Sequence, residues 1–401
     1  MKWEKVKLGD VTDSCLGKML DQNKNKGIFQ PYLANINVRW GSFDLDDLSE
    51  MRFEEHEQER YGLKYGDLVI CEGGEPGRCA IWKEQVPNMK IQKALHRVRV
   101  HDELDYRYLY YWFLLAGKRG ALDQYFTGAT IKHMPGDKLK TIEIEKPPLK
   151  IQKRIADILS AYDDLIENNQ KQIKLLEEAT QRMYKEWFID LRFPGHENTP
   201  IHNGLPEGWE KVTIADVCET VGGGTPSTSH NEYYENGTIR WVTPTDLTKK
   251  HSLILLDTEK RITQEGLKNS SAKLLPPETI LMTSRASIGY FALCEQEVST
   301  NQGFISCIPK QEEMRYYLLF NLMNRVDEIK GKATGSTFLE IAKRTFRELS
   351  IAIPSNILLT AFHEIVIPMI SKIRVTEKEI VQLLDARDRL LPQLMSGELK
   401  L

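Results

Sequence analysis

The sequence lacks the short motifs that carry nucleotide, cofactor or metal chemistry. It has no GxxxxGK[ST] segment, and the glycine-rich GGGTPSTS at 222–229 lacks the lysine that a nucleotide-hydrolysing P-loop needs. No GxGxxG follows an expected strand, so a dinucleotide or methyl-donor fold has no support. Neither HExxH nor a Cys/His cluster indicates a metal. We therefore expect a non-catalytic chain that holds no metal and no cofactor of its own.

Cysteines are few, and long apolar runs are missing. None of the six cysteines forms a CxxC pair, so neither a zinc ribbon nor a redox motif is indicated. No apolar run approaches the roughly 20 residues that a membrane-spanning helix needs. The N-terminal MKWEKVKLGD lacks the apolar core of a signal peptide. These features predict a soluble, cytoplasmic protein with reduced thiols.

Net positive charge is also missing, because the chain carries a formal charge of −3. This argues against a protein that coats DNA through charge alone. The charge is nevertheless segregated: residues 78–100 hold six basic residues and one acidic residue, while residues 43–59 hold eight acidic residues and one basic residue. The pattern is compatible with a local basic DNA-binding face and equally with two solvated faces.

The chain repeats itself. WEKVKLGDV at 3–11 matches WEKVTIADV at 209–217 in six of nine positions, at an offset of 206. TGAT at 127–130 meets TGST at 334–337 at an offset of 207, and the strand-like segment at 142–148 meets 349–355 at that same offset. Several matches in nearly one register indicate two copies of one unit, each a mixed domain followed by a long helix.

Each copy ends in an expected long helix. No glycine or proline occurs from Lys150 to Phe193, and Pro194-Gly195 closes this stretch. Heptad spacing predicts that the two helices pair with each other. If a pseudo-twofold axis relates the two copies across the seam, the helices run antiparallel. The second helix contains Pro368, which should break or kink it, and Gly397 is placed to end it. The expected pairing residues are Ile166, Ile173, Leu176, Met183, Ile373, Ile380, Leu383 and Leu390.

The predicted fold class is α+β: two duplicated mixed α/β domains separated by two long helices that form an antiparallel coiled coil with pseudo-twofold symmetry. The expected segments are listed in chain order. They are a first domain at 1–149, a first long helix at 150–193, a linker at 194–208, a second domain at 209–354 and a second long helix at 355–401.

These features together resemble the specificity subunit of type I restriction–modification systems. The resemblance lies in the order and duplication of a Trp-Glu-Lys-Val entry, a variable domain, a TG[AS]T segment, an apolar strand and a long helix. It implies that each variable domain is a target-recognition domain for one half of a split double-stranded DNA target. It also implies that the helices set the gap and dock two methyltransferase subunits. Those subunits would bind S-adenosylmethionine, and separate motor–nuclease subunits would use ATP and Mg²⁺.

Base readout needs donors and acceptors on loops, and phosphate contacts need Arg, Lys or small hydroxyl groups. The candidate DNA-binding residues are Arg78, Lys93, Arg97, Lys132, His133, Lys138, Ser284, Arg285, Asn301, Gln302, Lys343 and Arg344. Asn301 and Gln302 stand out, because a side-chain amide can pair bidentately with adenine. Two alternatives stay open: a coiled-coil scaffold with two protein-binding domains and no DNA role, and a duplicated nuclease.

Overall fold

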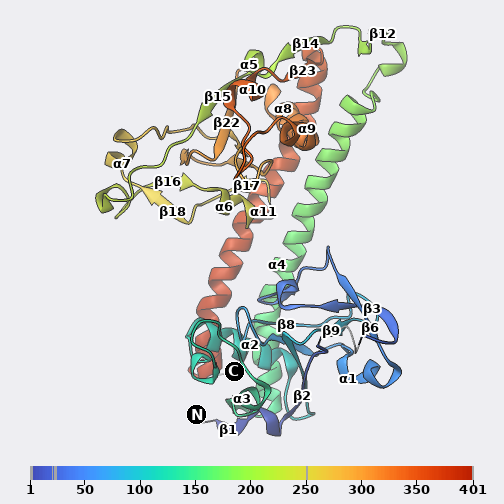
Figure 1. The fold of residues 1–401 in the computed structure, drawn as a ribbon, viewed down its shortest axis with the longest axis vertical. Helices are drawn as coiled ribbons and strands as arrows, with labels where there is room; N and C mark the ends of the chain where they lie inside the picture. The colour runs from blue at the N-terminus through green and yellow to red at the C-terminus, as the bar shows by residue number, and fades with distance from the viewer. Residues whose placement is uncertain (1–2, 20, 22–24, 250–251, 400–401) are drawn as a thin grey trace. The chain divides into compact units, whose positions relative to one another are not determined.

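The computed structural model describes residues 3–19, 21, 25–249 and 252–399. The chain forms two compact units (Figure 1). Unit 1 comprises Met1–Ile166 together with Leu383–Leu401, and unit 2 comprises Glu167–Gln382. Unit 1 is therefore built from two segments that are far apart in the sequence, whereas unit 2 is continuous.

Unit 1 is a mixed domain with a central antiparallel sheet in the order β2-β10-β7-β8. A smaller sheet has the order β6-β3-β9, and two strand pairs, β1-β11 and β4-β5, complete the unit. The strands are β1 (Glu4–Lys7), β2 (Thr12–Leu16), β3 (Ile28–Leu33), β4 (Val38–Arg39), β5 (Ser42–Phe43), β6 (Ser49–Phe53), β7 (Leu68–Cys71), β8 (Cys79–Ile81), β9 (Lys90–Ile91), β10 (Leu95–Val100) and β11 (Glu143–Lys146). The short and medium helices are α1 (Gln58–Tyr61), α2 (Tyr106–Lys118) and α3 (Gly136–Lys140).

Unit 2 contains a five-stranded sheet in the order β15-β22-β19-β20-β17, a three-stranded sheet β18-β16-β21 and the pairs β14-β23 and β12-β13. The strands are β12 (Ile201–His202), β13 (Leu205–Pro206), β14 (Glu210–Thr213), β15 (Cys218–Gly222), β16 (Ile239–Val242), β17 (Ile254–Leu255), β18 (Lys260–Ile262), β19 (Ile280–Thr283), β20 (Phe291–Cys294), β21 (Val298–Thr300), β22 (Phe304–Pro309) and β23 (Ser350–Ile353). The helices are α5 (Ile214–Val217), α6 (Pro244–Thr248), α7 (Gln264–Lys268), α8 (Met314–Asn324), α9 (Val326–Gly331) and α10 (Lys343–Arg347).

The two units repeat one topology, which confirms the duplication expected from the sequence. The order β2-β10-β7-β8 corresponds to β15-β22-β19-β20, and β6-β3-β9 corresponds to β18-β16-β21 with the same antiparallel and parallel pairings. The Trp-Glu-Lys-Val strand pairs with the strand before the long helix in both units, Glu4 with Lys146 and Glu210 with Ile353. In each domain the first and last strands therefore pair with each other, directly before the long helix begins.

Both long helices form, with one correction at the end of the first. α4 (Leu149–Tyr184) continues as a π-helical turn over Lys185–Ile189 and ends before Asp190, four residues short of the expected Phe193. The cause is a C-terminal capping motif: Leu191 adopts φ 57°, and the Arg192 N–H donates to the Glu186 carbonyl over 2.8 Å. α11 (Asn356–Ser396) ends before Gly397, as expected, where φ is 71°.

In each unit the two helices lie side by side and run antiparallel. In unit 1, Ile155 and Leu159 near the start of α4 share a core with Leu391 and Leu394 near the end of α11. In unit 2 the relation is reversed, because Tyr184 at the end of α4 packs on Phe362 near the start of α11, with ring centroids 6.3 Å apart. The prediction of an antiparallel helix pair is therefore confirmed.

The expected pairing residues are distributed between the buried seam and its flanks. Buried seam positions are Ile166, Ile173, Ile373 and Ile380. Half-buried flanking positions are Leu176, Met183, Leu383 and Leu390. Polar residues also enter the seam: the Asn169 amide donates to the Glu379 carboxylate over 3.4 Å.

The expectation that Pro368 breaks the second helix is wrong, because α11 is one continuous helix across this position. Pro368 and Glu364 are both exposed, so water can satisfy the carbonyl that proline leaves without a donor. The expectation that no segment is apolar and long enough to span a membrane also needs correction. By length and composition alone α11 is apolar enough to cross a bilayer. However, Phe362, Val366 and Ile370 are fully buried in unit 2, and a core helix meets the same criterion.

Candidate nucleic-acid interface

In unit 1, three loops meet at one edge of the central sheet. The loop at 72–78 follows β7, the loop at 92–94 precedes β10, and the loop at 127–133 carries the TGAT motif. The Glu72 N–H donates to the Ala94 carbonyl over 2.8 Å, which joins the first two loops. Bridges from His133 to Gly73 and to Thr127 join the first and third. Residues separated by some 60 positions in the sequence therefore form one surface.

Unit 2 builds the same surface from the corresponding loops. The Ser284 N–H donates to the Gly303 carbonyl over 2.8 Å, as Glu72 does to Ala94. Bridges from Glu340 to Arg285 and to Thr334 reproduce those made by His133. We call these two surfaces the loop edges: residues 72–78, 92–94 and 127–133 in unit 1, and residues 284–290, 301–303 and 334–340 in unit 2.

The loop edge of unit 1 brings four predicted residues together. Lys93 and Lys132 are exposed, so both can reach a phosphate, although the Lys132 ammonium already lies 3.4 Å from the Asp123 carboxylate. The His133 ring nitrogen Nδ1 lies 3.0 Å from the Glu72 carboxylate. Arg78 is turned inward instead: its guanidinium donates to Glu75 over 2.6 Å and to the Asn35 carbonyl over 3.0 Å. Arg78 therefore stabilises the loop through these hydrogen bonds, and its guanidinium is only partly exposed to solvent.

The loop edge of unit 2 has a different chemistry. Arg285 and Gln302 are exposed, and the Gln302 amide oxygen accepts a hydrogen bond from the Thr225 hydroxyl in the GGGTPSTS loop. The Asn301 amide oxygen accepts from the Gly303 N–H over 2.9 Å, so half of this amide is already used within the loop. Ser284 is buried. Each amide oxygen therefore already accepts one hydrogen bond, and the two residues differ in exposure: Gln302 is exposed to a base edge, whereas Asn301 is half-buried.

The remaining candidates lie outside the loop edges. Lys138 is exposed on α3, and Lys343 and Arg344 are exposed on the corresponding helix α10. The Arg344 guanidinium donates to Glu348 one turn later over 3.0 Å. Arg97 lies within β10 and is only 8% exposed. Sequence reasoning grouped all of these residues by charge, whereas the fold separates them by element.

Comparison with known proteins identifies the family. The profile described as the type I restriction modification DNA specificity domain matches residues 1–178 and 206–398, which is nearly the whole chain. The chain belongs to the type I restriction–modification DNA specificity family.

Individual relatives agree with this assignment. The type I restriction enzyme MjaIX specificity subunit of Methanocaldococcus jannaschii is 30% identical over 347 residues, covering 84% of this chain and 78% of that protein. The HindI specificity subunit of Haemophilus influenzae is 22% identical over 332 residues, covering 67% and 72%. The crystal structure of an S subunit from M. genitalium matches with a TM-score of 0.57 at 19% identity, covering 98% and 96%, and shows the shared fold.

Sequence reasoning missed the apolar part of the loop edges in this specificity-family chain. Ile131, which follows TGAT, is 64% exposed, and Phe338, at the equivalent place after TGST, is 57% exposed. An exposed apolar side chain beside polar donors suits contact with a thymine methyl group. The signal was present in the sequence, because both copies place a large apolar residue directly after the shared motif.

Proposed function

We propose that this chain reads a bipartite DNA target for a type I restriction–modification complex, with each unit reading one half-site through its loop edge. The observation that carries this proposal is that one scaffold presents the same three loops twice with different side chains. Unit 1 offers mainly cations, Lys93 and Lys132, whereas unit 2 offers the amide of Gln302 beside Arg285. A split target with two different half-sites requires two DNA-reading domains that share a backbone fold but carry different side chains on their reading loops.

In this proposal the paired helices fix the gap between half-sites and dock two modification subunits. Both helices leave large apolar side chains exposed, and exposed apolar surface marks protein contact sites. These exposed apolar side chains include Leu165, Leu175, Ile357, Val375 and Val381. The modification subunits would supply S-adenosylmethionine and methylate a flipped adenine, and motor–nuclease subunits would supply ATP- and Mg²⁺-dependent cleavage. This chain itself would contribute recognition and no catalytic group.

The test is a domain exchange read out as methylation mapped at base resolution, with modification subunits present. Replacing residues 209–353 with the matching domain of a relative should change one half of the methylated target and leave the other half and the gap intact. Inserting two heptads in register into both helices should lengthen the gap and change neither half. The matched control exchanges residues 201–208, the β12–β13 segment outside both loop edges, and should leave the target unchanged.

Two outcomes would contradict the proposal. A single-domain exchange that altered both halves would mean that the two units form one composite reading surface. A wild-type complex that methylated DNA without any sequence preference would remove the reading role and leave the chain as a scaffold that binds protein.

A further inference from the structure

Unit 1 contains a basic cavity away from its loop edge. The cavity has a volume of about 500 Å³ and lies between β2, β10, α1 and α3. Four cationic side chains line it: Arg97 and Arg99 on β10, Arg60 on α1 and Lys140 on α3. Arg60 and Lys140 are exposed, Arg99 is partly buried and Arg97 is 8% exposed. The cations therefore extend from the mouth of the cavity to its interior.

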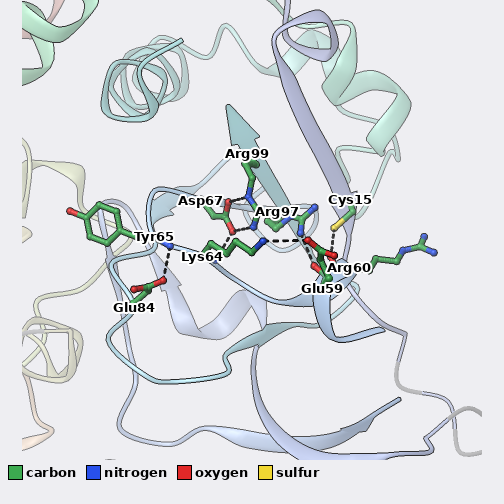
Figure 2. A network of polar contacts seen from close by, with 9 residues as sticks. All are labelled: Cys15, Glu59, Arg60, Lys64, Tyr65, Asp67, Glu84, Arg97 and Arg99. Carbon is green, nitrogen blue, oxygen red and sulfur yellow. Dashed lines mark hydrogen bonds and ion pairs between the residues drawn. The ribbon is translucent and has the colours of Figure 1, made fainter. Parts of the chain in front are cut away.

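Arg97 lacks a carboxylate partner among the residues that the structure describes. Its Nη1 donates to the backbone carbonyl of Glu59 over 3.1 Å, and its buried Nε has no hydrogen-bond partner (Figure 2). The buried carboxylate of Asp67 does not compensate, because Arg99 binds it bidentately at 2.7 and 2.8 Å. A buried guanidinium without a counter-ion is costly, so its charge needs another explanation.

The acidic groups that line the cavity already have partners other than Arg97. The Glu59 carboxylate lies 3.3 Å from the Lys64 ammonium, and the Asp13 carboxylate lies 3.5 Å from the His101 ring. Burial raises the pKa of the Cys15 thiol beside Arg97, so the thiol stays neutral. The cavity therefore keeps a net positive charge and has room for an anion.

Unit 2 serves as an internal comparison, because its strands follow the same register. Thr12 pairs with Val100 as Cys218 pairs with Pro309, so Arg97 and Arg99 correspond to Ser306 and Ile308. Val98 pairs with Leu68 as Cys307 pairs with Ile280, so Asp67 corresponds to Thr279. The same sheet therefore forms without these three charges. Folding alone does not require them in unit 1, which favours a ligand.

We propose that this cavity binds an oxyanion of the phosphate class, held by Arg97 and Arg99, with Arg60 and Lys140 drawing it to the mouth. Guanidinium groups suit this ligand because their planar, fork-shaped donor sets match phosphate oxygens. The phosphate belongs either to the DNA backbone or to a small phosphate compound. The DNA source rests on the function proposed above, and the small-phosphate source is independent of it.

The first arm of the test uses inorganic phosphate and the full chain. Calorimetric titration with phosphate, at ionic strength held constant with chloride, should show saturable binding to the wild type. Arg97→Ser, which installs the residue of unit 2, should weaken that binding at least tenfold. Lys140→Gln and Arg60→Gln, both at exposed positions, should weaken it several-fold, and they decide the outcome if Arg97→Ser does not fold. Arg344→Gln, an exposed cation on α10, is the matched control and should bind phosphate like the wild type.

The second arm separates the two sources, using target duplex with modification subunits present. If the phosphate is part of DNA, inorganic phosphate competes with duplex, and Arg97→Ser lowers the slope of log affinity against log salt by about 0.9. If the phosphate is a small compound, the same variants lose phosphate binding and keep duplex affinity. Either result supports the cavity as an oxyanion site.

Equal phosphate and duplex binding by the wild type, Arg97→Ser and Lys140→Gln would overturn the inference while leaving the proposed function untouched. Conversely, a wild-type complex that bound no duplex would end the proposed function. The phosphate titration alone would then decide the inference.

Discussion

The carboxylate of Asp163 on α4 accepts a hydrogen bond from the guanidinium of Arg387 on α11 over 2.5 Å. The same carboxylate accepts the hydroxyl of Tyr111 on α2 over 2.7 Å, so one acid joins both long helices to the domain of unit 1. Burial disfavours the charge on Arg387, but Asp163 and Asp388 overcome this and raise the pKa of the guanidinium. In unit 2 the 207-residue repeat places Ile370 and Thr180 at the corresponding positions, so the second copy dispenses with this ion pair.

Removing the acid should therefore cost more than removing the pair. Asp163→Asn should lower the free energy of unfolding by about 1.5–3 kcal/mol, since a mostly buried guanidinium loses a charged partner. The double variant Asp163→Ile with Arg387→Thr, which copies unit 2, should recover part of that loss, because it leaves no unpaired guanidinium, although the Tyr111 hydroxyl still loses its acceptor. Urea unfolding measures both, and a neutral Asp163→Asn would refute the assigned role.

Two fully buried seam threonines should respond in opposite directions to the same substitution. Among the described residues the Thr376 hydroxyl has no hydrogen-bond partner, whereas the Thr180 hydroxyl donates to the Glu177 carbonyl over 2.8 Å. Thr376→Val should stabilise the chain by about 1 kcal/mol, because it removes an unsatisfied hydroxyl. Thr180→Val should destabilise it by about 1 kcal/mol, because it removes a satisfied one. Urea unfolding midpoints of the two variants test this prediction. Equal shifts in the same direction would contradict the assigned difference in hydrogen bonding.

Stability should fall as the pH drops below about 6.5, the unperturbed pKa of histidine. Burial lowers the pKa of His96 in unit 1, whose Nε2 lies 2.8 Å from the Met134 carbonyl, and of His363 in unit 2, which stacks on Tyr316. Because folding depresses these pKa values, the neutral rings contribute stability above the unfolded pKa and lose it as pH falls toward the folded one.

Substitution of the buried histidines tests this account. His96→Gln and His363→Gln should each flatten the decline in unfolding free energy between neutral and mildly acidic pH. Substitution of exposed His202 is the control and should leave the slope as it is. An unchanged slope in both buried-site variants would show that other groups cause the acid sensitivity.

Given the proposed function, the two amides on the loop edge of unit 2 should have different roles: one contacts a DNA base, and the other stabilises the loop. Gln302→Ala should reduce affinity for the target by about 1–3 kcal/mol and relax one base position, because an exposed amide would lose its base contact. Asn301→Ala should lower the free energy of unfolding by about 1 kcal/mol without relaxing specificity, because the Gly303 N–H loses its acceptor. Gln311→Ala, exposed outside the loop edge, is the control. Methylation mapping and unfolding curves distinguish the two, and relaxed specificity in Asn301→Ala alone would reverse the roles.

The sequence predicts the helix pair well, for a physical reason. A heptad pattern records burial directly, so the seam positions Ile173 and Ile373 could be identified from spacing alone. The effect of Pro368 could not, because a proline breaks a helix only where nothing satisfies the freed carbonyl, and exposure of that turn is a tertiary property. The capping turn at Leu191 was likewise invisible, since leucine carries no signal for a left-handed conformation.

The candidate site was only partly predictable from residue type. Charge identified Lys93 and Lys132, which the fold places together on one loop edge. It also identified Arg97, which the fold places at the interior of a separate cavity, because a strand shows which residues share a face but not what covers that face. Hydrogen bonds within the loop, which distinguish Asn301 from Gln302, depend on backbone geometry that no short motif encodes.

The division of the chain into units has a consequence for synthesis on the ribosome. Unit 2 is continuous, so all of its residues can leave the exit tunnel in one stretch and fold together. Unit 1 uses residues from both ends: Leu391 and Leu394 complete its core, and Gly397 lies against Trp3. The domain that is translated first must therefore wait, with an open hydrophobic face, until more than two hundred further residues have been added. Nascent chains arrested with residues up to 382, but not 383–401, outside the exit tunnel should accordingly expose that face to proteases or chaperones, although their unit 2 is already complete.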